Sequence, residues 1–112
     1  MKEIFMNEKW YLVIRTEETC ERNNQSREYE YEDRYELAQG LSFYLPGQRE
    51  KCYIRSVISR DSGVDVVLVK PVEYAEELSS DKPLDMYYST YRESCGDGID
   101  ERYRVHISIE HS

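Results

Sequence analysis

The sequence has few cysteines, and they form no recognisable framework. Cys20, Cys52 and Cys95 are an odd number at wide spacing, without a C-x-x-C pair. This pattern excludes a disulfide scaffold. It also disfavours a structural zinc site, because such sites use paired ligands. Reduced thiols are typical of proteins inside cells, so we expect a cytoplasmic location.

Long apolar runs are also missing. No stretch approaches the roughly 20 apolar residues that a membrane-spanning helix needs. Residues 1–8 include acids and no continuous apolar segment, so we expect no signal peptide. We therefore predict a protein that has no contact with a membrane.

Motifs for nucleotides and for catalysis are absent too. The chain has neither G-x-x-x-x-G-K-[ST] nor G-x-G-x-x-G. Cys52 and His106 are the residue types of a nucleophile and its base, but no local signature supports that pair. We therefore expect no cofactor and no enzymatic activity. A small enzyme that uses Cys52 or His106 stays open as an alternative.

Acids outnumber bases. The chain has 23 acidic and 15 basic residues, a formal net charge of −8. Long-range repulsion then disfavours direct binding to nucleic acid or to anionic membranes and favours basic partners. The plainer alternative is that the acidity only keeps a small protein soluble.

Length and composition indicate one ordered domain over residues 1–112. A chain of 112 residues has the usual size of a domain. The apolar share is 39%, but eleven tyrosines add large rings that bury apolar area.

Several segments read as β-strands. Residues 10–16 are β-branched and aromatic throughout, which is typical of a central strand. Residues 51–58 and 64–69 flank the turn 60–63 and predict a hairpin. Residues 103–109 alternate between apolar and polar side chains, as a half-buried strand does.

Other segments read as helices. Tyr31, Tyr35 and Leu45 belong to an apolar series at helical spacing, and residues 73–78 and 80–91 continue in the same way. Residues 28–32 alternate with period two, so a strand there stays open. The fold prediction is α+β: a single domain with an antiparallel sheet of four to five strands and two helices. Its element order, β-α-β-β-α-β, is that of the ferredoxin-like fold. Strands 10–16 and 64–69 would be central, and strands 51–58 and 103–109 would be edges.

Two acidic segments are the candidate binding sites. In an extended chain, side chains on one face are roughly 7 Å apart, close to the spacing of phosphates along one DNA strand. Neighbouring tyrosines would add contact area, as interfaces favour. The alternative is that both segments are ordinary solvated faces. The predicted partner-binding residues are Glu28, Tyr29, Glu30, Tyr31, Glu32, Asp33, Tyr35, Glu36, Glu73, Glu76 and Glu77.

The leading functional hypothesis is a non-enzymatic protein that binds a basic surface on a larger, nucleic-acid-binding protein. Its most concrete form is a nucleic-acid-mimicking inhibitor of a host nuclease, such as a restriction or CRISPR effector, of the phage or mobile-element type. The alternative is a ferredoxin-like regulatory or ligand-binding module that dimerises through an exposed sheet edge.

Overall fold

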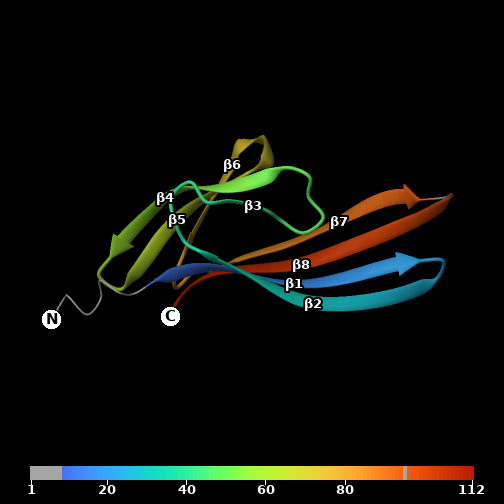
Figure 1. Cartoon of the computed structure of the whole chain (residues 1–112), viewed down its shortest axis with the longest axis horizontal. Coiled ribbons are helices and arrows are strands. Elements are labelled where there is room, and N and C mark those ends of the chain that lie inside the picture. The colour runs from blue at the N-terminus through green and yellow to red at the C-terminus, as the bar shows by residue number, and fades with distance from the viewer. Residues whose placement is uncertain (1–8, 95) are drawn as a thin grey trace.

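The computed structural model describes residues 9–94 and 96–112, and this part of the chain is almost entirely β-strand (Figure 1). The strands form two antiparallel four-stranded sheets. Sheet A has the order β2-β1-β8-β7, with β1 at Trp10–Arg22, β2 at Gln25–Glu36, β7 at Leu84–Ser94 and β8 at Asp97–His111. Sheet B has the order β3-β4-β5-β6, with β3 at Ser42–Tyr44, β4 at Lys51–Arg60, β5 at Gly63–Lys70 and β6 at Tyr74–Ser79.

The core lies between the two sheets. On sheet A, Leu12 faces Ile109 and Ile14 faces Ile107 across β1 and β8. These side chains belong to one buried cluster with apolar residues of sheet B such as Leu68. Alternation along each strand therefore turns one face of each sheet inward and leaves the other face to solvent.

The hairpin predicted around residues 60–63 is confirmed, and the structure contains another hairpin between β1 and β2. The turn between β1 and β2 uses Asn23 and Asn24, whose φ angles are 51° and 62°. Positive φ at both central residues is the type I′ geometry, which matches the twist of paired strands and which asparagine tolerates. Strands β4 and β5 form the second hairpin, with Arg60 opposite Gly63.

The predicted α+β fold with two helices is wrong. Residues 31–45 contain the end of β2 and the short β3, residues 73–78 belong mainly to β6, and residues 80–91 lead into β7. The only helical element in the described residues is a 3₁₀ turn, η2 (Pro71–Glu73). The helical spacing misled because a separation of four residues, as between Tyr31 and Tyr35, keeps two side chains on one face of a strand as well as of a helix.

The predicted ferredoxin-like order is wrong as well. Strands 10–16 and 64–69 are not a central pair, because β1 and β5 belong to different sheets. The predicted edges at 51–58 and 103–109 are interior strands, since β4 lies between β3 and β5, and β8 between β1 and β7. The alternative prediction that residues 28–32 form a strand is confirmed, because these residues lie within β2.

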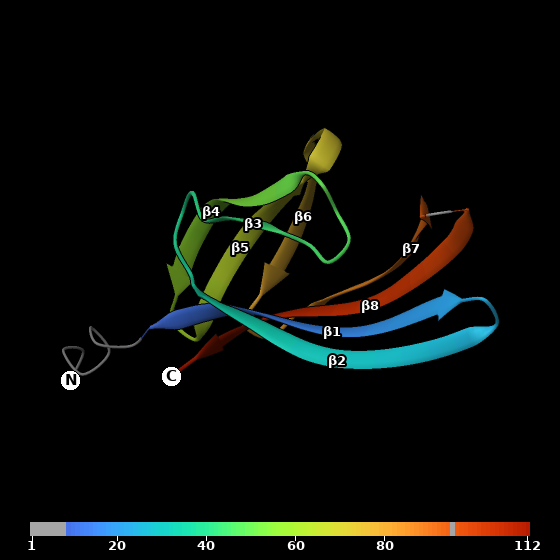
Figure 2. The ribbon, with the colours of Figure 1, turned by 45° about the vertical axis from the view of Figure 1, so that its right-hand side comes forward.

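Sheet A is longer than sheet B. The hairpins β1–β2 and β7–β8 project to one side of the body, where the second sheet no longer covers them (Figures 1 and 2). The principal-axis extents of 62 × 26 × 19 Å reflect this projection. Where the projecting hairpins join the body, the loop between β3 and β4 covers the inner face of sheet A. There the Tyr88 hydroxyl donates to the Pro46 carbonyl at 2.5 Å. Tyr29, closer to the tip, keeps 46% of its surface exposed.

Candidate interaction surface

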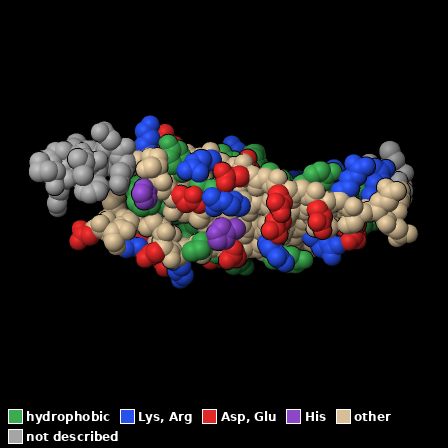
Figure 3. Space-filling view, turned by 90° about the horizontal axis from the view of Figure 1, so that it is seen from below, with side chains coloured by type: hydrophobic (Ala, Val, Ile, Leu, Met, Phe, Trp, Pro, Cys, Tyr) green, Lys and Arg blue, Asp and Glu red, His purple; other side chains and the backbone are tan. Residues whose placement is uncertain are grey.

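The outer face of sheet A gathers most of the charged residues of its strands. Pairing between strands places four side chains in one row across it, namely Glu32 on β2, Arg15 on β1, His106 on β8 and Asp85 on β7. Viewed from below, this face displays acidic and basic side chains side by side (Figure 3). Acids and bases are therefore interspersed on this surface, which we call the charge mosaic. How far the charge of each acid is compensated depends on the bases beside it.

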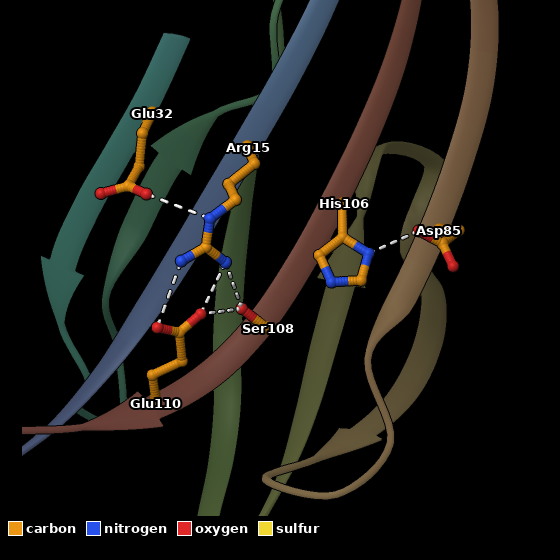
Figure 4. Close-up of polar contacts among 6 residues, drawn as sticks. All are labelled: Arg15, Glu32, Asp85, His106, Ser108 and Glu110. Atoms are coloured by element: carbon orange, nitrogen blue, oxygen red, sulfur yellow. Dashed lines mark hydrogen bonds and ion pairs between the residues drawn. The ribbon is translucent and has the colours of Figure 1, made fainter.

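Arg15 occupies the centre of the mosaic (Figure 4). Its Nε lies 3.1 Å from an oxygen of Glu32, and its two terminal nitrogens donate to the two oxygens of Glu110 at 2.6 and 3.2 Å. The Ser108 hydroxyl donates to Glu110 at 2.6 Å. These hydrogen bonds from Arg15 and Ser108 lower the pKa of Glu110 to about 2. Glu32 and Glu110 thus share the single positive charge of Arg15.

His106 and Asp85 form the other end of the row. The Nδ1 atom of His106 lies 2.6 Å from a carboxylate oxygen of Asp85, and Figure 4 shows the ring turned toward that carboxylate. Both side chains are exposed to solvent, at 41% and 75%. An exposed pair of this kind contributes little to stability.

Strand β2 separates the predicted binding residues onto two faces. Glu28, Glu30, Glu32 and Glu36 share the outer face, because their pairing partners on β1 do. Tyr29, Tyr31, Asp33 and Tyr35 alternate with them and share the inner face. The carboxylates and the tyrosine rings of β2 therefore present two different surfaces.

Two tyrosines of β2 make contacts within the protein. Tyr35 stacks on Phe43 of sheet B with ring centroids 5.6 Å apart. The Tyr31 hydroxyl donates to Glu18 at 2.9 Å, and burial together with this bond raises the pKa of Tyr31. Tyr35 is thus a packing residue, and Tyr29 is the more accessible ring.

On the outer face of β2, Glu28 and Glu30 are the acids left without a cation. Within the described residues neither carboxylate makes an ion pair. Glu30 also lies directly opposite another acid, Glu17 of β1, on the same face. Arg104 relieves this contact only weakly, since its nitrogen is 3.9 Å from Glu17. Like charges opposite each other on neighbouring strands are destabilising, so this corner holds unbalanced negative charge.

The part played by Glu17 was missed in the sequence. It directly follows the apolar run of residues 10–16 and lies outside the alternating segment 28–32. Only the register of β1 against β2 brings Glu17 to Glu30. The alternation of residues 28–32 was a signal for Glu30. The signal for Glu17 was the turn at Asn23 and Asn24, because a two-residue turn fixes the register of the strands that it joins.

The second predicted acidic segment lies elsewhere. Glu73 belongs to η2, and Glu76 and Glu77 belong to β6, an edge strand of sheet B. Glu76 is paired with Lys70 at 2.9 Å. The two acidic segments therefore stand on different sheets and do not form one continuous row.

The structure does not bring together the residues of the catalytic alternative. Cys52 is buried between the sheets, and burial raises the pKa of its thiol to about 11. His106 lies on the outer face of sheet A, beyond the core from Cys52. No cluster of metal-ligating side chains occurs in the described residues, and Cys95 lies outside them.

Neither the fold nor likeness to other proteins assigns this surface a role. No helix in the described ranges is long and apolar enough to cross a membrane. The corner made by Glu17, Glu28 and Glu30 is the site with the clearest unbalanced charge. No family model matches the chain, and no curated protein or solved structure shows significant similarity to it.

Proposed function

We propose that the acidic corner formed by Glu17, Glu28 and Glu30 binds a basic surface on a larger, nucleic-acid-handling protein. The observation that carries the proposal is the like-charge pair of Glu17 and Glu30, which the protein retains on an exposed face next to an open sheet edge. Binding a lysine or arginine there would relieve a repulsion that the isolated protein bears.

The geometry of β2 supports mimicry of a nucleic acid strand. Glu28, Glu30 and Glu32 lie on one face of one strand, which spaces their side chains at roughly 7 Å. Glu28 and Glu30 make no ion pair within the described residues, and Glu32 shares Arg15 with Glu110. A row of carboxylates at that spacing resembles a row of phosphates. In this role the protein would occupy a basic groove and exclude nucleic acid from it, as a nuclease inhibitor does.

The test compares two variants that change the net charge equally. Glu28→Lys/Glu30→Lys reverses the corner on sheet A, and Glu73→Lys/Glu77→Lys reverses two acids of sheet B. The probe is a synthetic poly-arginine peptide, and binding is measured by calorimetry at several salt concentrations. We expect at least about a tenfold loss of affinity for the first variant and a much smaller loss for the second.

A second arm asks whether the same corner recognises a nucleic-acid-binding protein. The wild-type chain is immobilised, a cell lysate is passed over it, and duplex DNA is added as competitor. Retained proteins that DNA displaces, and that the Glu28→Lys/Glu30→Lys variant fails to retain, support the proposal. Equal losses for both variants would show that only the overall charge matters, and the assignment of the site would then fall.

A further inference from the structure

The two edges of sheet A differ in charge. Strand β2 is one edge and β7 is the other. An edge that carries charges resists pairing with another strand, whereas an uncharged edge is a template for it. Strand β7 has no charge between Met86 and Tyr91, while β2 carries charges at Arg27, Glu28, Glu30, Glu32, Asp33, Arg34 and Glu36.

Strand β7 also lacks the other devices that protect an edge. It runs for 11 residues and contains neither lysine nor proline. Its register against β8 is unbroken from Leu84 to Ser94, so no bulge twists it away. Within the described residues it pairs with β8 alone, and Tyr87 and Tyr91 on its outer face are 67% and 62% exposed.

The half of β7 nearest the hairpin tip is accessible from the side. It belongs to the part of sheet A that projects beyond sheet B (Figures 1 and 2). On its inner side a recess of about 700 Å³ lies between Thr90 and Arg92 of β7 and the loop Gly47–Glu50. Side chains of an added strand therefore have room on this side.

We propose that β7 pairs with β7 of a second copy of this chain, antiparallel about a two-fold axis at Thr90. A two-fold axis perpendicular to the sheet places outer face beside outer face, which makes the contact self-complementary. Ser89 then lies opposite Tyr91 of the second copy, and Tyr88 lies opposite Arg92. Tyr87 meets Glu93, so no two like charges face each other.

The charge distribution fits this partner. Each copy has a net charge of −8, and two copies repel unless their acids are kept apart. The charged strand β2 is the edge opposite β7, with β1 and β8 between them. Pairing through β7 joins the less charged edges and leaves both β2 strands at the far edges of one continuous sheet.

The test measures mass by sedimentation equilibrium on the whole chain over a range of concentrations. The variant Ser89→Lys/Tyr91→Lys brings lysines face to face in the proposed pairing. Its matched control, Ser26→Lys/Tyr29→Lys, makes the same replacements on β2. All four positions are solvent-exposed, and circular dichroism with a urea midpoint checks that each variant keeps its fold.

We expect the wild type and the β2 variant to sediment at twice the monomer mass. We expect the β7 variant to dissociate with an equilibrium constant weakened by about 100-fold, because close like charges oppose association. A wild type that stays monomeric up to about 1 mM would overturn the proposal, since such an interface would be negligible. A dimer that survives in the β7 variant, or that is lost in the β2 variant, would overturn it too.

Discussion

Arg15 and Glu110 are 95 residues apart in the chain, yet two parallel hydrogen bonds join the guanidinium of one to the carboxylate of the other. Such bidentate pairs are among the stronger polar contacts in proteins. This pair ties β1 to β8 on the outer face of sheet A. It also explains the low pKa of Glu110.

The first prediction concerns acid stability. The pKa of Glu110 falls from 4.5 to about 2 on folding, so its ion pair contributes fully above about pH 4.5 and is lost as the pH drops toward 2. Glu110→Gln should flatten this dependence. Because the side chain is partly exposed, the difference is expected to be about 1 kcal/mol. Urea unfolding of the wild type and the variant at several pH values measures it.

The second prediction concerns the core. Ile107 is fully buried and faces Ile14 across the two middle strands of sheet A. Ile107→Ala removes buried methyl groups and leaves a cavity, so the free energy of unfolding should fall by about 2–5 kcal/mol. Ile58, which is 60% exposed, is the control. An Ile58→Ala effect as large as that of Ile107→Ala would show that the two sheets do not pack as described.

The third prediction concerns the turn before β6. Val72 has φ 66° and ψ 20°, a left-handed conformation that a β-branched residue rarely adopts, and its side chain is 83% exposed. Val72→Asn should raise the free energy of unfolding by about 1 kcal/mol, because asparagine tolerates this conformation. Thermal unfolding measures the gain. Val72→Ile, which keeps the branched side chain, should give none.

The fourth prediction concerns thiol reactivity. Burial raises the pKa of Cys52 to about 11, so its thiolate is scarce near neutral pH and its sulfur is shielded. Iodoacetamide at pH 8 should therefore modify Cys52 much more slowly than the partly exposed Cys20. Mass spectrometry of the digested protein measures both sites. Adding urea should abolish the difference, and rapid native labelling of Cys52 would contradict its burial.

The sequence predicted local pairing well and long-range arrangement poorly. The hairpin of β4 and β5 was predictable because its strands adjoin and Gly63 marks the turn. The helices predicted after Tyr31 and around Leu84 were wrong, because apolar residues four apart suit a strand equally. A segment with this spacing becomes a strand when a neighbouring strand pairs with it. For β7 that neighbour is β8, which follows it in the chain after the turn.

The candidate site was predictable to a similar degree. The alternation at Glu28, Glu30 and Glu32 indicated that these acids share a face if extended, and they do. Their ion pairing was not evident from this segment alone, because Arg15 on β1 pairs with Glu32 and, within the described residues, no cation pairs with Glu28 or Glu30. The turn at Asn23 and Asn24 sets the register of β1 against β2, whereas no local pattern sets the register of β1 against β8, which supplies Glu110.

The pairing of β1 with β8 determines when this fold can form. β1 is made before β2 to β7, but one of its two neighbours, β8, is made only after them. Contacts between distant segments slow folding, because a long loop must close before they form. On the ribosome, the β1–β2 and β4–β5 hairpins can form first, but sheet A cannot be completed until β8 has been made. Until then the edge of β1 that pairs with β8 stays open, and its unpaired backbone groups make the nascent chain a natural client for chaperones.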